Sequence, residues 1–170
     1  MTSVKLPRQV DFEKMAQNRA HLAGSLELTE FVRLLPSLAN EQGKVTIDLI
    51  FSRDPKGSAH CVGEVTLECN LQCQRCLQPY LHTQKAPIGL TAVKDHDAAL
   101  GIESTMEPII TGGESIALVD MIEDELLLVM PLIPKHPLDQ CPVEVESSNT
   151  EKTRLELELT EWKAKLKPFI

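Results

Sequence analysis

Residues 45–69 read VTIDLIFSRDPKGSAHCVGEVTLEC and predict two β-strands joined by a tight turn. In the first part of this stretch every second residue is apolar, which is the period of a half-buried strand. Residues 54–57 follow with proline second and glycine fourth, an order that type I turns favour. A second strand is predicted over 59–69, and one or two more over 77–92. Together these segments predict an antiparallel β-meander, partly barrel-like.

Helices are predicted before and after this meander. Apolar residues recur at helical spacing through 11–39, which predicts two N-terminal helices. The clearest helix runs over 116–130, with Ser115 as its cap and Pro131 as its stop. Because it is apolar on most of its surface, we expect it to be buried against the sheet. The predicted fold class is therefore α+β.

The C-terminal part of the chain has a different character. Four prolines between 131 and 142 exclude a regular helix there. Beyond them an amphipathic helix is predicted from apolar residues at helical spacing, which are Leu155, Leu159, Trp162 and Leu166. We therefore expect one α+β domain over residues 1–142, followed by an acidic linker and the amphipathic helix over 143–170.

The composition limits the partners of the protein. The chain of 170 residues is 42% hydrophobic and 25% charged, which is typical of a soluble globular protein. Aromatic residues make up only 4%, and the formal net charge is −8, so neither base stacking nor general attraction to phosphate is expected. No apolar run is long enough to span a membrane, and the N-terminus lacks the apolar region of a signal peptide. We therefore predict a cytoplasmic protein with no membrane partner.

Five cysteines in a chain expected in the cytosol suggest metal ligands or buried thiols rather than disulfides. Cys73 and Cys76 have the C-x2-C spacing that lets two thiolates of one turn bind the same zinc ion. A second pair completes a candidate closed structural zinc site, whose donors should lie within about 4 Å of one another: Cys73, Cys76, His136 and Cys141. The alternative is that these cysteines are ordinary buried thiols. Cys61 and Cys69 fall on the inward phase of their strand and are interpreted as core residues.

Positive charge is concentrated near the paired cysteines. From Cys69 to Lys85 there is no acidic residue, although the chain as a whole is acidic. Candidate contacts to a partner or to RNA phosphate in this segment are Arg75, Tyr80, His82 and Lys85. Chance placement of charge is the simpler alternative.

Asp120, Glu123 and Asp124 share one face of the predicted buried helix. Carboxylates at this spacing are candidate ligands of a divalent cation, whereas a solvated helix edge is the simpler alternative. The sequence contains no phosphate-binding loop, nucleophile elbow or HExxH zinc motif. We therefore predict a protein that is not an enzyme, with no catalytic residues and no small-molecule substrate.

Two blocks of sequence carry a family resemblance. The first is LQCQRCL, residues 71–77, which follows a strand and contains the pattern C-x-R-C. The second is LVDMIEDEL, residues 118–126, which continues through MPLIP, residues 130–134, to residues 136–141. Both blocks are similar to the signatures of the YceD family, the large ribosomal RNA subunit accumulation proteins. The resemblance covers residues 4–142.

This resemblance implies a non-enzymatic factor for synthesis, processing or stability of the large-subunit (23S) ribosomal RNA, in bacteria and in plastids. Since an acidic chain poor in aromatic residues suits a basic partner better than bare RNA, we expect it to act as an adaptor on a basic ribosomal or assembly protein. Direct contact with the precursor RNA stays open. Two other functions also stay open: a metal-dependent enzyme that uses the acidic helix around Asp120 and Asp124, and a zinc-stabilised regulatory module unrelated to ribosomes.

Overall fold

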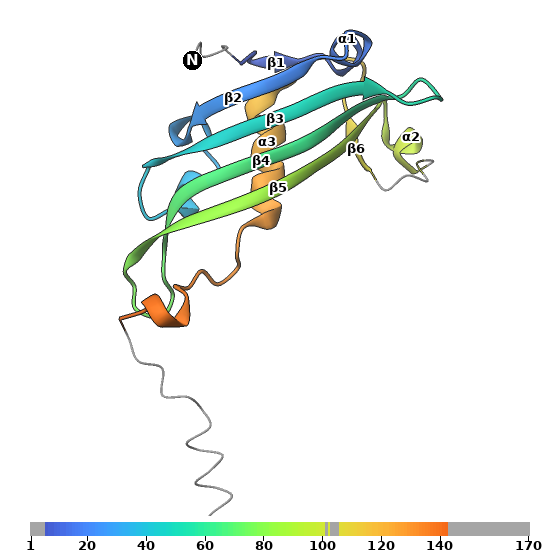
Figure 1. The fold of residues 1–170 in the computed structure, drawn as a ribbon. Coiled ribbons are helices and arrows are strands. Elements are labelled where there is room, and N and C mark those ends of the chain that lie inside the picture. The colour runs from blue at the N-terminus through green and yellow to red at the C-terminus, as the bar shows by residue number, and fades with distance from the viewer. Residues whose placement is uncertain (1–5, 101, 103–105, 143–170) are drawn as a thin grey trace, which may run out of the picture. The chain divides into compact units, whose positions relative to one another are not determined.

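The computed structural model describes residues 6–100, 102 and 106–142. Five strands form one sheet in the order β2-β3-β4-β5-β6 (Figure 1). Their bounds are β2 His21–Glu27, β3 Gly43–Arg53, β4 Ala59–Gln72, β5 Pro79–Val93 and β6 Glu107–Ile110. Neighbouring strands run antiparallel from β2 to β5, whereas β6 lies parallel to β5 along Leu90–Val93 only.

A second, two-stranded sheet and several short helices complete the described fold. In this small sheet β1, Gln9–Val10, pairs with β7, Ile116–Ala117. The α-helices are α1 Phe12–Gln17, α2 His96–Leu100 and α3 Leu118–Val129, and the 3-10 helices are η1 Leu28–Glu30, η2 Leu35–Ser37 and η3 Leu138–Gln140. The chain up to Lys135 forms one compact unit, in which α3 runs behind the large sheet and crosses its strands (Figure 1).

The predicted α+β class and the antiparallel meander are confirmed. The predicted range 77–92 contains a single strand, β5, which begins at Pro79, and the predicted turn joins β3 to β4. In this turn the Gly57 N–H donates to the Asp54 carbonyl at 3.0 Å, and the Ser58 N–H donates to Asp54 Oδ1 at 2.8 Å. The large sheet is open and mixed, not a closed barrel, because β2 and β6 stand at its two ends and β6 joins in parallel.

The prediction of two helices within 11–39 was wrong. Only α1 is an α-helix there, and β2 and the 3-10 helices η1 and η2 follow it. The backbone turns left-handed at Arg19, with φ of 48°, and β2 then pairs with β3 over its whole length. The hydrogen bonds of that pairing outweigh a helical pattern that is weak and is interrupted by Gly24.

The predicted cap of the buried helix was also wrong. The helix α3 begins at Leu118, with Ala117 at the N-cap position and no side-chain hydrogen bond to the cap. Ser115 does not cap it, because the two residues between them form β7 and pair with β1. The predicted stop is confirmed, since α3 ends at Val129 ahead of Pro131.

The core lies on the side of the sheet that faces α1 and α3. Alternate residues of β3 and β4 point into it and are at most 1% exposed, among them Val45, Ile47, Leu49, Phe51, Val65 and Leu67. The rings of Phe12 and Phe51 meet edge to face, with their centroids 5.4 Å apart. No helix in the described ranges has both the length and the apolar character that a membrane crossing needs.

The predicted acidic linker and C-terminal helix, residues 143–170, lie outside the described residues. The domain boundary after residue 142 therefore stays a prediction. The last described element is the 3-10 helix η3.

Candidate metal centre and acidic helix

The turn between β4 and β5 carries the C-x2-C pair. The Cys73 N–H donates to the Gln78 carbonyl at 3.0 Å, and the Leu77 N–H donates to the Cys73 carbonyl at 2.8 Å. Leu77 has φ of 60°, a left-handed conformation that costs a non-glycine residue free energy and that tightens the return into β5. The turn is thus closed by its own backbone, and Cys73 and Cys76 are both held on it.

The Cys73 sulfur receives a backbone donor within the same turn. The Arg75 N–H points at Cys73 Sγ at 3.4 Å. An N–H aimed at sulfur stabilises the negative charge of a metal-bound thiolate. On the other side of the turn the Gln74 N–H donates to the Pro134 carbonyl at 2.8 Å. This bond holds Pro134, which belongs to the proline-rich segment of residues 131–142, against the turn.

The four predicted metal ligands come together. One ligand atom from each residue lies within 4.8 Å of the other three, and the residues are Cys73, Cys76, His136 and Cys141. Cys73 is buried and the other three are partly exposed. Three thiolates and one imidazole are a donor set that binds soft or borderline divalent metals. The cluster can therefore hold a metal ion.

The remaining two cysteines are core residues, as predicted. Cys61 and Cys69 are fully buried on the inner face of β4. Burial raises the pKa of the Cys61 thiol to about 12, and the nearby Glu125 carboxylate adds to the effect. Burial also raises the pKa of the Cys69 thiol to about 11. Both thiols stay protonated at neutral pH and are neither ligands nor nucleophiles.

The four residues predicted to contact a partner or RNA, which lie within residues 69–85, do not share one face of the sheet. Tyr80 and His82 lie on the inner phase of β5, with ring centroids 6.0 Å apart, and burial raises the pKa of Tyr80. Lys85 points to the opposite face, where its ammonium group pairs with Glu64 at 2.6 Å. Arg75 lies in the turn between the cysteines, and its Nη1 atom is buried without a hydrogen-bond partner in the described part of the chain.

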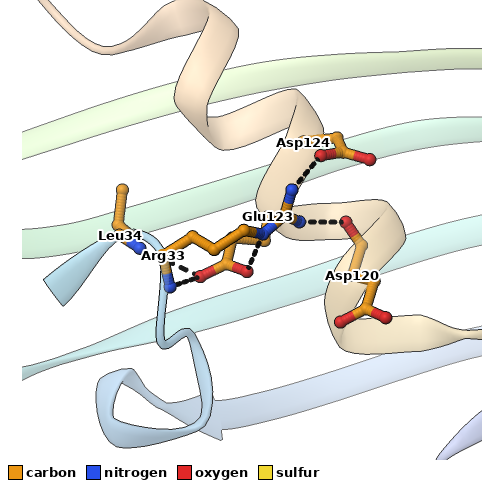
Figure 2. A network of polar contacts seen from close by, with 5 residues as sticks. All are labelled: Arg33, Leu34, Asp120, Glu123 and Asp124. Carbon is orange, nitrogen blue, oxygen red and sulfur yellow. Dashed lines mark hydrogen bonds and ion pairs between the residues drawn. The ribbon is translucent and has the colours of Figure 1, made fainter.

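The acidic face of α3 is tied to an arginine that sequence reasoning missed. Glu123 is only 2% exposed, and its carboxylate accepts hydrogen bonds from the backbone N–H groups of Arg33 and Leu34, at 2.7 and 2.9 Å. The Arg33 side chain adds a third bond, from Nε to Glu123 at 2.7 Å (Figure 2). Its Nη1 reaches the Asp124 carboxylate at 2.6 Å, and its Nη2 reaches the Asp120 carbonyl at 3.1 Å.

This network argues against a cation site on α3. The two carboxylates nearest to Arg33, first Glu123 and then Asp124, raise the pKa of its guanidinium group. The guanidinium occupies the place that a metal would need, and the α3 carboxylates do not form a metal-ligating group in the described ranges. A sequence signal existed in the lone arginine of the apolar run FVRLL, residues 31–35. The acidic face therefore anchors the segment before η2 to the helix.

Comparison with known proteins places the chain. A curated protein of Haemophilus influenzae, "Large ribosomal RNA subunit accumulation protein YceD", is 34% identical over 148 residues, which cover 86% of this chain and 84% of that protein. No solved structure gives a match. The family model described as "Large ribosomal RNA subunit accumulation protein YceD" matches residues 61–169, which include the C-x2-C turn, α3 and the proline-rich segment. This chain therefore belongs to the YceD family.

Proposed function

We propose that this chain is a non-enzymatic factor that supports synthesis, processing or stability of the large-subunit (23S) ribosomal RNA in the cytoplasm. The observation that carries this proposal is the 34% identity, across 86% of the chain, to a protein named for large ribosomal RNA subunit accumulation. The described polar residues of α3 support it further, because they hold the fold together instead of facing one another across an open site.

The protein acts as an adaptor on a basic ribosomal or assembly protein. Its formal net charge of −8 repels the phosphate backbone at long range and attracts basic proteins. Lys85, the lysine of the candidate contact set, is already paired with Glu64, which leaves less positive charge for phosphate. The precursor RNA is therefore reached through the basic partner.

Cells that lack this chain test the proposal. We expect the ratio of large-subunit to small-subunit ribosomal RNA to fall, most clearly in the cold or in slow growth, and to recover when the chain is supplied again. Northern analysis of both RNAs in matched cultures measures the ratio. An unchanged ratio under these conditions contradicts the proposal.

We further propose that the cysteine–histidine cluster holds a structural zinc ion. Three cysteines and one histidine fill the four positions of a tetrahedral zinc site, so no position is left for substrate or water. The limit of 4.8 Å between the donors is wider than the ~3.8 Å expected between ligands around zinc bound at about 2.3 Å. Small side-chain movements therefore accompany binding.

The charge balance of such a site supports the assignment. Zinc with three thiolates and a neutral imidazole has a net charge of about −1. Arg75, between two of the cysteines, supplies a positive charge and has a buried Nη1 atom with no hydrogen-bond partner in the described ranges. Its backbone N–H already points at the Cys73 sulfur. The turn thus offers both ligands and compensating charge.

Metal content of the purified full chain tests the zinc site. We expect about one zinc ion per chain and a loss of thermal stability when a strong chelator removes it. The double variant C73S/C76S should bind none, whereas C69A, which removes a cysteine of the core, should keep the metal. A metal-free wild type, or equal loss in C69A, contradicts the site. Zinc binding combined with an unchanged ribosomal RNA ratio would instead favour a zinc-stabilised regulator unrelated to ribosomes.

A further inference from the structure

Two hollows border the same two elements of the compact unit, and the second also borders the ends of β4 and β5 that meet at their turn. One element is the segment of residues 30–40, and the other is α3 with the residues that follow it. The first hollow, of about 380 Å³, is lined by Glu30, Val32, Arg33, Asp120, Glu123 and Asp124. The second, of about 670 Å³, is lined by Leu38, Leu127, Met130 and Leu132 together with polar residues such as Asn40 and Gln72. The two hollows follow one another along α3, from its first turns to its end.

The first hollow is acidic. Its lining contains four carboxylates and one guanidinium, a formal charge of −3. Arg33 engages Glu123 and Asp124 through its side chain but reaches only the backbone of Asp120. The carboxylates of Asp120 and Glu30 carry no ion pair in the described part of the chain, and Figure 2 shows the Asp120 carboxylate apart from the dashed contacts. Two carboxylates thus remain available to a second cation.

The second hollow has a mixed lining, but the end of α3 and the residues after it expose apolar side chains. Leu132 is fully exposed, Leu128 is 74% exposed and Ile133 is 62% exposed. Leu128 continues the exposed row of Asp120 and Asp124 along α3, since the three positions are four residues apart. The exposed row of α3 therefore changes from acidic to apolar toward the C-terminal end of the helix.

The geometry points to these two hollows as one docking surface for a segment of a protein partner, with arginine or lysine at one end and aliphatic side chains at the other. This inference rests on the adaptor role proposed above and names the surface that serves it. Charge complementarity selects the occupant, because carboxylates in the first hollow attract a guanidinium or ammonium group and repel phosphate. From Asp120 to Val129, the end of α3, the helical rise is about 14 Å, which about four residues of extended chain can span, and Leu132 lies three residues further along the chain.

Binding of a synthetic peptide to the purified full chain tests the surface. The probe is a peptide of about eight residues with two arginines near one end and two leucines near the other, labelled for fluorescence anisotropy. The double variant E30Q/D120N should weaken binding about tenfold and reduce its salt dependence, since two charge contacts are lost. L132S should also weaken binding about tenfold while the salt dependence stays, because only apolar contact is lost.

A matched control removes the same charge elsewhere. Glu27 and Glu114 are exposed and line neither hollow, so E27Q/E114Q should bind the peptide like the wild type. The inference is overturned if this control weakens binding as much as E30Q/D120N, if neither test variant weakens binding, or if polyuridylate displaces the peptide. Peptide binding is measured in vitro and the ribosomal RNA ratio in cells, so failure of the surface is distinguished from failure of the proposed function.

Discussion

Glu123 is the residue whose side chain organises the contact between α3 and the segment before η2. Its carboxylate accepts three hydrogen bonds, two from backbone N–H groups and one from Arg33 Nε, at a position that is only 2% exposed. A buried N–H that loses its acceptor keeps the full cost of desolvation. The geometry thus makes Glu123 a structural residue of the fold.

We predict that E123Q lowers the free energy of unfolding by about 2 kcal/mol, because the amide keeps only part of the hydrogen bonds and removes the charge opposite Arg33. Urea unfolding of the full chain measures the change. The matched control is D124N on the same helix, whose side chain is 63% exposed and which should change stability by less than about 0.5 kcal/mol. Equal effects of the two variants would show that Glu123 is only part of a solvated helix edge.

Among single residues, the sequence predicted the grouping of the cysteine–histidine cluster better than the role of the acidic helix. Cys73 and Cys76 are close in sequence, and their spacing alone shows that one ion can bind both. Glu123 and Arg33 are 90 residues apart, and no local spacing reveals that they meet. The amphipathic pattern placed Glu123 on the solvent edge, whereas the backbone of another segment covers it.

Among the elements, β4 contains a glycine whose backbone other residues cannot adopt without strain. Gly63 has φ of 155°, and a Cβ atom built there would lie 2.0 Å from the Asp48 carbonyl oxygen of β3. We predict that G63A lowers the free energy of unfolding by about 2 kcal/mol or more. The control is G89A in β5, where an added Cβ meets no atom within 4 Å. Thermal unfolding of both variants measures the difference, and similar midpoints would refute the prediction.

The helix α1 has a charged N-cap that should respond to pH. Asp11 accepts a hydrogen bond from the Lys14 N–H, and its carboxylate pairs with the Lys14 ammonium group at 2.9 Å. The Lys14 side chain is the main cause that lowers the pKa of Asp11 below 3.8. A lowered pKa in the folded state means that the stabilisation is present above the ordinary pKa and is lost as pH falls through the lowered value.

We therefore predict that D11N, which keeps the cap but loses the charge, is less stable than the wild type at pH 7. The difference should shrink as the pH falls below 3.8 and vanish once Asp11 is protonated. Unfolding midpoints of both proteins across this range measure it. A constant difference from pH 7 to acid would show that the Asp11 charge has no part in the stability.

The meander could be predicted because each strand carries its own period of two and its own turn signal. The strand β2 could not be predicted, because its inward residues are small or only partly buried. It is a strand because it pairs with β3. The two residues of β7 likewise depend on β1, which is far away in sequence. Elements defined by local pattern are readable in the sequence, whereas elements defined by a distant partner are not.

For the whole molecule, the net charge sets the behaviour toward nucleic acid. We predict that bare ribosomal RNA binds the purified chain more weakly than about 1 µM at physiological salt, and that raising the salt concentration weakens this binding further. Filter binding across a salt series measures both quantities. Nanomolar affinity that resists salt would contradict the adaptor role and would favour direct recognition of RNA.

The fold class could be predicted from composition and periodicity, but the mixed order of the sheet could not. β6 enters as a parallel strand after a long connection, and nothing within the four residues of β6 signals its direction. The partly barrel-like closure expected from a meander does not occur because this parallel strand ends the sheet. The direction of a strand at the end of a sheet depends on how the rest of the chain packs, and the strand's own residues do not reveal it.

The short pairing between β6 and β5 has a consequence for aggregation. β6 pairs with β5 only along Leu90–Val93, so no described strand lies on that side of β5 between Pro79 and Gly89. An exposed strand edge of this length is a template for pairing with another chain, as in fibre growth. Pro79 and Pro87 have no N–H to offer such a neighbour, and Lys85 places a charge between them. We therefore expect these residues to disfavour edge-to-edge pairing between concentrated chains.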